Sequence, residues 1–162
     1  MSWIDKELKR RAKAVEPAPR PDWEAPDPAR IIGDLWQRLE RANAALPAAL
    51  RLKLELVETP PRMGPHVRTW LRAPNGAALG FAGDAIRYTW PERNARRSHN
   101  FWITWNPNLQ QLVVSQRIGS ATPPVMRSWR LDVQRIEQLL QGLVTSRQVK
   151  PSSLRKRRLW LF

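Results

Sequence analysis

The chain has 162 residues, about the length of one domain, and carries 28 Lys and Arg against 14 Asp and Glu, a formal net charge of +14. Apolar residues make up 42% of it, enough to form a core, and the lack of Cys excludes a disulfide scaffold, a thiolate zinc site and a cysteine nucleophile. No apolar run approaches the roughly 20 residues that cross a bilayer, and the first residues are charged where a signal peptide is apolar. We therefore expect a cytoplasmic protein, with peripheral membrane contact as an alternative.

The positive charge is distributed unevenly. Residues 145–162 contain six bases and no acid, and residues 61–100 contain seven bases and two acids. Such a field attracts polyanions, which means nucleic acid, an acidic protein surface or an anionic membrane. Most of the bases are Arg, whose planar fork suits phosphate, although a GC-rich genome would also favour Arg.

Residues 1–16 are predicted to form an amphipathic helix, because Ile4 and Leu8 share one face with Trp3 beside them. So short a helix is marginal in water and needs a surface to lie on, so these three residues are candidate docking residues. Residues 17–27 contain four prolines and are predicted to be an extended linker.

Residues 28–144 are predicted to form the main domain. Asp27 as N-cap and Pro28 at the first helical position predict a second helix, which ends before Pro47, and Asp132 is expected to cap a last helix. Alternation and turn residues predict strands at 51–58, 66–73, 77–81, 85–90, 101–105 and 110–118, with hairpin turns at 74–76 and 106–108 and a loop at 119–128.

Consecutive hairpins favour a single antiparallel sheet, because parallel pairing would need long crossovers. We therefore expect an α+β, two-layer fold in which two helices pack on one sheet of about five strands. Strict alternation of Leu52, Leu54 and Leu56 with charged residues predicts that the first strand is half-buried. The chain then ends in a basic tail over residues 145–162.

Two of the nine Trp residues are candidates for ligand contact. Alternation places Trp70 on the face of Arg68 and Arg72, and Trp102 on the face opposite Phe101 and Ile103. If one face of the sheet is open, it would present flat aromatic rings among guanidinium groups, an arrangement that holds single-stranded nucleic acid. A sheet covered on both faces would instead make the same Trp residues part of the core.

Two further segments are candidate anion sites. The loop at 92–98 contributes Arg93, Arg96 and Arg97, which either clamp phosphates or simply keep the loop solvated. The C-terminal tail contains four bases followed by four apolar residues: Arg155, Lys156, Arg157, Arg158, Leu159, Trp160, Leu161 and Phe162. The tail could dock in a partner's groove, lie on an anionic membrane, or pack back as an edge strand on the protein's own sheet.

Signals for catalysis are weak. His66, His99 and Asp84 have no metal-ligand spacing, and no phosphate loop, nucleophile elbow or zinc-protease motif is present. We therefore expect a non-enzymatic binding or adaptor protein without a metal or cofactor, and nucleic acid is the favoured partner. The alternative is a peripheral membrane or protein-assembly adaptor that docks through its two termini.

Overall fold

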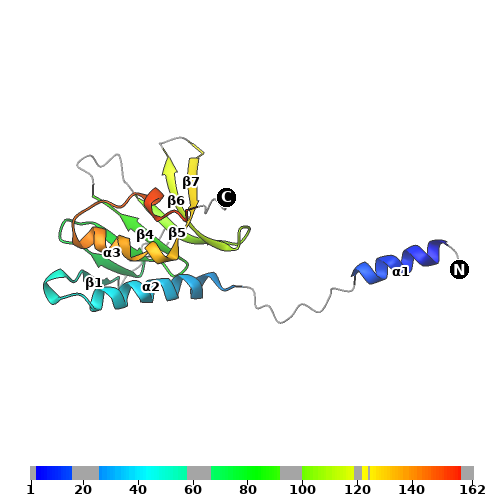
Figure 1. The fold of residues 1–162 in the computed structure, drawn as a ribbon, viewed down its shortest axis with the longest axis horizontal. Helices are drawn as coiled ribbons and strands as arrows, with labels where there is room; N and C mark the ends of the chain where they lie inside the picture. Colours follow the sequence, from blue (N-terminus) through cyan, green and yellow to red (C-terminus); the bar gives the residue numbers. More distant parts are fainter. Residues whose placement is uncertain are drawn as a thin grey trace.

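The computed structural model describes residues 3–15, 26–57, 67–91, 100–118, 122–123 and 125–157, with side chains in the first range described only up to Arg11. Within these residues the chain forms one seven-stranded antiparallel sheet and three α-helices (Figure 1). The helices are α1 (Trp3–Val15), α2 (Pro28–Ala44) and α3 (Glu137–Val144), and short 3-10 turns are η1 (Ala48–Leu50), η2 (Val133–Arg135) and η3 (Pro151–Leu154). The α+β class predicted from the sequence is confirmed.

The strands follow one another across the sheet in chain order, so every neighbour pair is antiparallel. They are β1 (Lys53–Leu56), β2 (Thr69–Arg72), β3 (Ala78–Phe81), β4 (Ala85–Thr89), β5 (Phe101–Asn106), β6 (Gln111–Ile118) and β7 (Val125–Arg130). The predicted number of about five strands is wrong. The prolines at 123 and 124 indicated a loop over 119–128, but β7 begins immediately after them.

The core lies between one face of the sheet and the helices α2 and α3. In α2, Ile32, Leu35 and Leu39 are buried at helical spacing, and Trp36 stacks on Phe81 of β3 at 5.5 Å between ring centroids. Asp27 caps the helix as predicted, because its Oδ1 accepts a hydrogen bond of 3.1 Å from the Ala29 N–H. Asp132 likewise accepts from the Gln134 N–H, but the helix that it starts begins as the 3-10 turn η2.

The predicted two-layer arrangement holds only for the middle of the sheet. At one edge, Leu54 and Leu56 of β1 are 51% and 76% exposed, so the expectation that β1 is half-buried is wrong. At the other edge, β6 and β7 extend past the helices, and no residue of β7 is buried (Figure 1). Alternation predicted which side chains share a face, but the contacts of α2 with β4 and β5 decide which of them are covered.

Residues 145–157 pack on the same face as α2 and α3. The Val149 N–H donates a 3.0 Å hydrogen bond to the Tyr88 hydroxyl, and Leu154 is fully buried. Arg155 forms an antiparallel bridge with Leu131, and the Lys156 N–H donates to the Arg130 carbonyl at 2.9 Å. Residues 145–157 of the predicted tail therefore return to the edge of the sheet at the end of β7, and residues 158–162 lie outside the described residues.

Candidate nucleic-acid interface

The two faces of the sheet differ in what covers them. Side chains such as Leu79, Tyr88 and Ile103 join α2 and α3 in the hydrophobic core, and we call their side the helix-covered face. We call the opposite side of the sheet the open face, because the buried residues of the described helices do not pack against that side. By strand register its side chains are those of Lys53, Glu55, Trp70, Arg72, Ala78, Gly80, Ala85, Arg87, Thr89, Trp102, Thr104, Asn106, Gln111, Val113, Ser115, Arg117, Met126, Ser128 and Arg130.

One cross-strand row of the open face passes through all seven strands. It contains Glu55, Trp70, Gly80, Arg87, Trp102, Ser115 and Ser128, one residue from each strand. Neighbouring strands lie about 4.8 Å apart, so the backbones at Trp70 and Trp102, three strands apart, are separated by about 14 Å. The sheet therefore presents two indole rings in one line across its strands.

Trp70 leans across β3 because residue 80 is glycine. A Cβ added to Gly80 would lie 2.8 Å from Cζ3 of Trp70, which is closer than van der Waals contact allows. The Arg72 guanidinium lies 5.3 Å from the Trp70 ring centroid, in cation–π range, and its Nε donates to the Glu55 carboxylate at 2.9 Å. The Arg72 guanidinium also holds the pKa of Glu55 below its ordinary value.

Trp102 has an equivalent arginine from the neighbouring strand. The Arg87 guanidinium lies 5.2 Å from the Trp102 ring centroid, and among the described residues no carboxylate forms an ion pair with it. The Nε atom of Arg87 is buried without a hydrogen-bond partner. Oδ1 of Asn100 is also buried without one, and Asn100, two residues before Trp102, lies on the same face of the sheet as Trp102. Most buried polar atoms have a hydrogen-bond partner, so these two atoms are an unusual feature of the open face.

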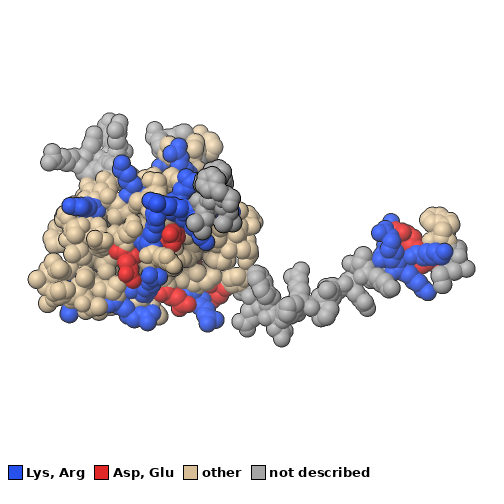
Figure 2. Space-filling view, in the orientation of Figure 1, with Lys and Arg blue, Asp and Glu red and all other residues tan. Residues whose placement is uncertain are grey.

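The charge of the open face is strongly positive. Its strand residues include five bases, Lys53, Arg72, Arg87, Arg117 and Arg130, against the single acid Glu55. On the side of α2 and α3, which Figure 2 shows, Lys and Arg also cover more of the visible surface than Asp and Glu, on α1 as well as on the rest of the described chain. A phosphate backbone laid across the open face would therefore meet mainly positive charge.

The structure brings three predicted residues together and separates a fourth. Trp70, Arg72 and Trp102 share the open face. Arg68 is exposed, and its N–H donates to the carbonyl of Phe81. Phe81 is also the register partner of Thr69, so Arg68 and Thr69 both lie opposite Phe81, which is the pattern of a β-bulge. The alternation that placed Arg68 beside Trp70 is broken there, and Val67 instead reaches the Trp70 side, 2.8 Å from the position of a Cβ on Gly80.

The other predicted site residues lie elsewhere. Arg155, Lys156 and Arg157 are exposed and follow η3 near the end of β7. Trp3, Ile4 and Leu8 of α1 are 77%, 51% and 61% exposed. Residues outside the described ranges are Arg93, Arg96, Arg97, Arg158, Leu159, Trp160, Leu161 and Phe162, together with His66 and His99.

Sequence analysis missed Arg87 and Gly80. Arg87 alternates with Ile86 and Tyr88 in a predicted strand, so its exposure on the Trp face was detectable from the alternation. Its place beside Trp102 was not, because that depends on which residues of β4 and β5 are opposite each other. The role of Gly80 depends likewise on the register between β2 and β3.

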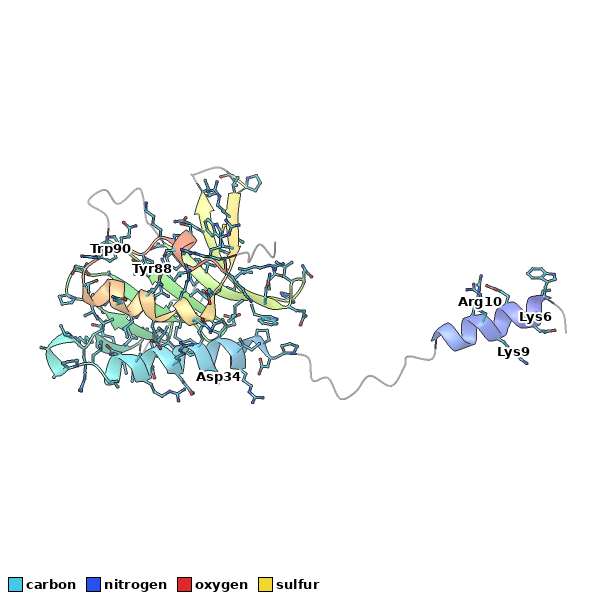
Figure 3. All side chains as sticks on the ribbon, in the orientation of Figure 1. Lys6, Lys9, Arg10, Asp34, Tyr88 and Trp90 are labelled. Carbon is cyan, nitrogen blue, oxygen red and sulfur yellow. The ribbon has the colours of Figure 1, made fainter. Side chains whose placement is uncertain are left out.

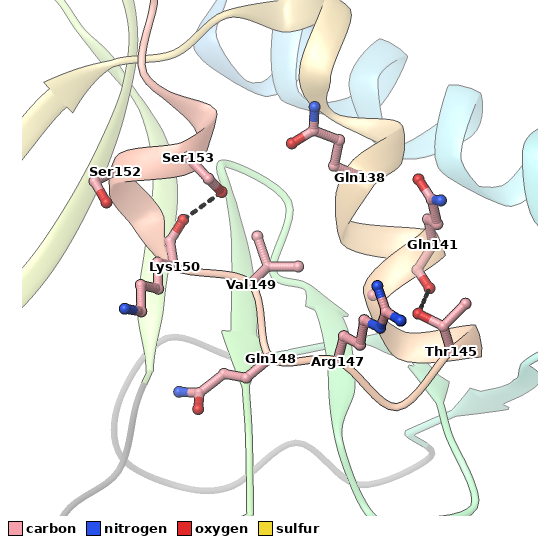
Figure 4. A pocket seen from close by; sticks show the side chains of 10 residues that line it. Gln138, Gln141, Thr145, Arg147, Gln148, Val149, Lys150, Ser152 and Ser153 are labelled. Carbon is pink, nitrogen blue, oxygen red and sulfur yellow. Dashed lines mark hydrogen bonds between the residues drawn. The ribbon is translucent and has the colours of Figure 1, made fainter.

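One pocket among the described residues lies away from this row. It has a volume of about 490 Å³ and lies between the end of α3 and residues 145–153 (Figure 4). Its hydroxyls at Thr145 and Ser153 donate to the backbone carbonyls of Gln141 and Lys150, and its lining has no His, Asp or Glu. This pocket therefore lacks the imidazole and carboxylate side chains that most often act as general acid or base.

Among the described residues, no three His, Asp or Glu side chains are grouped as metal ligands would be. None of the helices described is both long enough and apolar enough to span a bilayer. Comparison with protein-family models, with curated proteins and with solved structures finds no match for this chain.

Proposed function

We propose that this protein is a non-enzymatic nucleic-acid-binding protein and that its open face binds a single strand. The observation that carries the proposal is the row in which Trp70 and Trp102 each lie beside an arginine on a face that no described helix covers. Bases stack on such rings, and guanidinium groups pair with the phosphates between them.

The spacing of the two rings is compatible with one strand spanning both. About 14 Å between the backbones at Trp70 and Trp102 is several times the roughly 3.4 Å rise of stacked bases. Because Trp70 leans across β3 toward Trp102, bases on the two rings would be separated by no more than a few nucleotides. Gly80 and Arg87 lie between them in the row, one without a side chain and one with a positive charge. A bound strand would thus run across the β-strands rather than along them.

The test is fluorescence anisotropy of a labelled single-stranded oligonucleotide with the full chain, measured over a salt series. We expect affinity to fall steeply with salt, because phosphate neutralisation releases counterions. Trp102→Ala should weaken binding roughly 5-fold to 150-fold, since one stacked base contributes about 1–3 kcal/mol. Salt-independent binding, or no binding at low salt, would show that the proposal is wrong.

A matched control comes from the other face of the sheet. Arg127 lies 6.0 Å from the Trp129 ring centroid, and the register puts this pair on the helix-covered side. Arg87→Gln and Arg127→Gln each remove one charge next to one Trp. We expect Arg87→Gln to weaken single-strand binding about 5-fold, from a cation–π and phosphate contact of about 1 kcal/mol, and Arg127→Gln to change it less than twofold.

Docking through α1 is a second candidate function, supported by the exposure of its apolar residues. Trp3, Ile4 and Leu8 are all more than half exposed, and Lys6, Lys9 and Arg10 project from the same helix (Figure 3). Such a helix suits an anionic bilayer surface or the groove of an assembly partner. Ile4→Glu/Leu8→Glu should abolish sedimentation with vesicles of phosphatidylcholine and phosphatidylglycerol; sedimentation unchanged by this variant would reject the membrane version.

A further inference from the structure

β1 is the first strand of the sheet, and its outer edge has no neighbouring strand among the described residues. It pairs with β2 alone. The Val57 N–H donates to the Arg68 carbonyl, just before β2, at 2.9 Å. Alternation along the strand therefore directs the backbone N–H and C=O groups of Leu54 and Leu56 away from β2. Such a row of outward groups is a template for a further strand.

The side chains at this edge are apolar on the helix-covered face. Leu54 and Leu56 lie opposite Leu71 and Thr69 of β2, which are both buried, yet they are 51% and 76% exposed themselves. α2 leaves them uncovered, because its contacts with the sheet are mainly those with β4 and β5. Exposed leucines beside outward backbone groups favour association, so this edge suits a defined partner strand.

Asn43 of α2 limits where a partner strand can pair. Its side chain accepts from the Leu52 N–H at 2.8 Å and donates to the Leu52 carbonyl at 3.1 Å, so it satisfies both outward groups of that residue. Asn43 is itself buried just before the start of β1. A partner strand can therefore pair with Leu54 and Leu56 but not with Leu52.

We propose that this partner is a second copy of the chain, paired antiparallel through β1 across a two-fold axis normal to the sheet. That symmetry keeps the helices of both copies on one side and pairs residues of the same face. Leu54 then lies opposite Leu56 of the second copy. The outward backbone groups of both residues exchange hydrogen bonds, and the exposed leucines of the two copies pack together.

Other registers of the same pairing fit less well. Same-face pairing allows only shifts of two residues. A shift in one direction places the second copy against the backbone groups that Asn43 already holds, and a shift in the other leaves Leu54 opposite no residue of β1. In the proposed register Glu55 faces Glu55 of the second copy. Each carboxylate has Arg72 at 2.9 Å and Lys53 at 3.4 Å in its own copy, which offsets the repulsion between the two.

This register also aligns the cross-strand rows of the two copies. Glu55 belongs to the row of Trp70 and Trp102, so the two rows meet end to end. The backbones at Trp70 in the two copies are then three strand spacings apart, about 14 Å, as are those at Trp70 and Trp102 within one copy. The dimer presents evenly spaced tryptophans to a single strand; that use rests on the proposed function, whereas the pairing does not.

The chain lacks Cys, so single cysteines report the pairing directly. Glu55→Cys lies on the two-fold axis, where facing Cα atoms are about 4.5 Å apart, within disulfide range. Lys53→Cys is the matched control on the same strand and face, about 14 Å from its counterpart. With diamide as oxidant, we expect Glu55→Cys to become mainly disulfide-linked dimer and Lys53→Cys to stay mainly monomer. Equal cross-linking of the two variants, or none of Glu55→Cys, overturns the proposed pairing.

Sedimentation velocity of the full chain without nucleic acid measures the dimer itself. Each copy carries a net charge of +14, so we expect self-association to strengthen as salt rises from about 0.1 M to about 0.5 M, whereas nucleic-acid affinity falls. Leu56→Lys should weaken the dimer about tenfold or more. Leu109→Lys, which changes another exposed leucine far from β1 in sequence, should not.

Thermal unfolding of each variant checks that the fold is retained. A wild-type chain that remains monomeric at about 200 µM and high salt, or that forms species larger than a dimer, contradicts the two-fold pairing. The single-strand proposal fails separately, in the anisotropy experiment with the oligonucleotide at low salt.

Discussion

The two faces of the sheet are built from alternate residues of the same strands, yet one face is packed into the core and the other is not. On the helix-covered face Ile86 and Ile103 are fully buried and have closely packed neighbours. On the open face, one residue along each strand, Arg87 and Trp102 lie beside each other and stay partly exposed. Stability should therefore depend mainly on the first face, and ligand binding on the second.

The largest expected difference is between neighbouring residues of β5. Ile103→Ala should lower the free energy of unfolding by about 2–4 kcal/mol, because it removes buried methyl groups and leaves a cavity. Thr104→Ala, on the open face, should change it by less than about 0.5 kcal/mol. Urea denaturation followed by circular dichroism measures both; equal losses would contradict the assignment of the two faces.

Gly80 is a position where the open face also affects stability. Gly80→Ala should cost about 1–3 kcal/mol, because the new Cβ forces Trp70 and Val67 to shift, and it should weaken single-strand binding by displacing Trp70. Gly33→Ala in α2 is the control, since nothing lies within 4 Å of its Cβ position and alanine favours helix by about 1 kcal/mol. The two changes should thus shift the unfolding midpoint in opposite directions.

Tyr88 connects the helix-covered face to residues 145–157. Tyr88→Phe should cost about 1 kcal/mol, because the Val149 N–H loses its hydroxyl acceptor. Single-strand affinity should stay unchanged. Urea denaturation and anisotropy measure the two effects.

The same tyrosine should make the stability of the folded protein depend on pH in the alkaline range. Burial raises the pKa of Tyr88 above its ordinary value of 10.0, so the folded protein holds the phenol proton more tightly than the unfolded chain. The resulting stability is present below pH 10 and is lost as pH rises through the raised pKa. Because the chain has a single Tyr, tyrosinate absorbance reports this group alone, and a midpoint at or below 10 would refute the burial argument.

The smallest expected effect concerns the one acid of the open face. Glu55→Gln should raise single-strand affinity by up to about twofold, because exposed ion pairs are weak and Arg72 is released from its partner. Arg72 lowers the pKa of Glu55, so wild-type affinity should rise as pH falls through that lowered pKa, while the variant stays level. Anisotropy titrations at several acidic pH values measure this difference.

Much of the local structure could be predicted from the sequence. The Asp27-Pro28 start of α2 and the turns at Asn75-Gly76 and Asn106-Pro107 depend on backbone preferences and on side-chain hydrogen bonds to nearby residues. β7 escaped prediction because prolines mark the end of a loop as well as its interior. The burial of β1 was wrongly predicted because alternation alone does not show how far the helices extend across a sheet.

Some features of the open face could likewise be predicted from the sequence, and others could not. The basic charge, the alternation of the strands and the placement of Trp70 and Trp102 opposite apolar neighbours could be predicted, since they follow from residue type and the two-residue period of a strand. Three features could not be predicted without the folded structure: both rings fall in one row, Arg87 adjoins Trp102, and the bulge at Arg68 and Thr69 breaks the expected cluster. Those features depend on register between strands distant in sequence, which is set by the packing of the whole sheet against its helices.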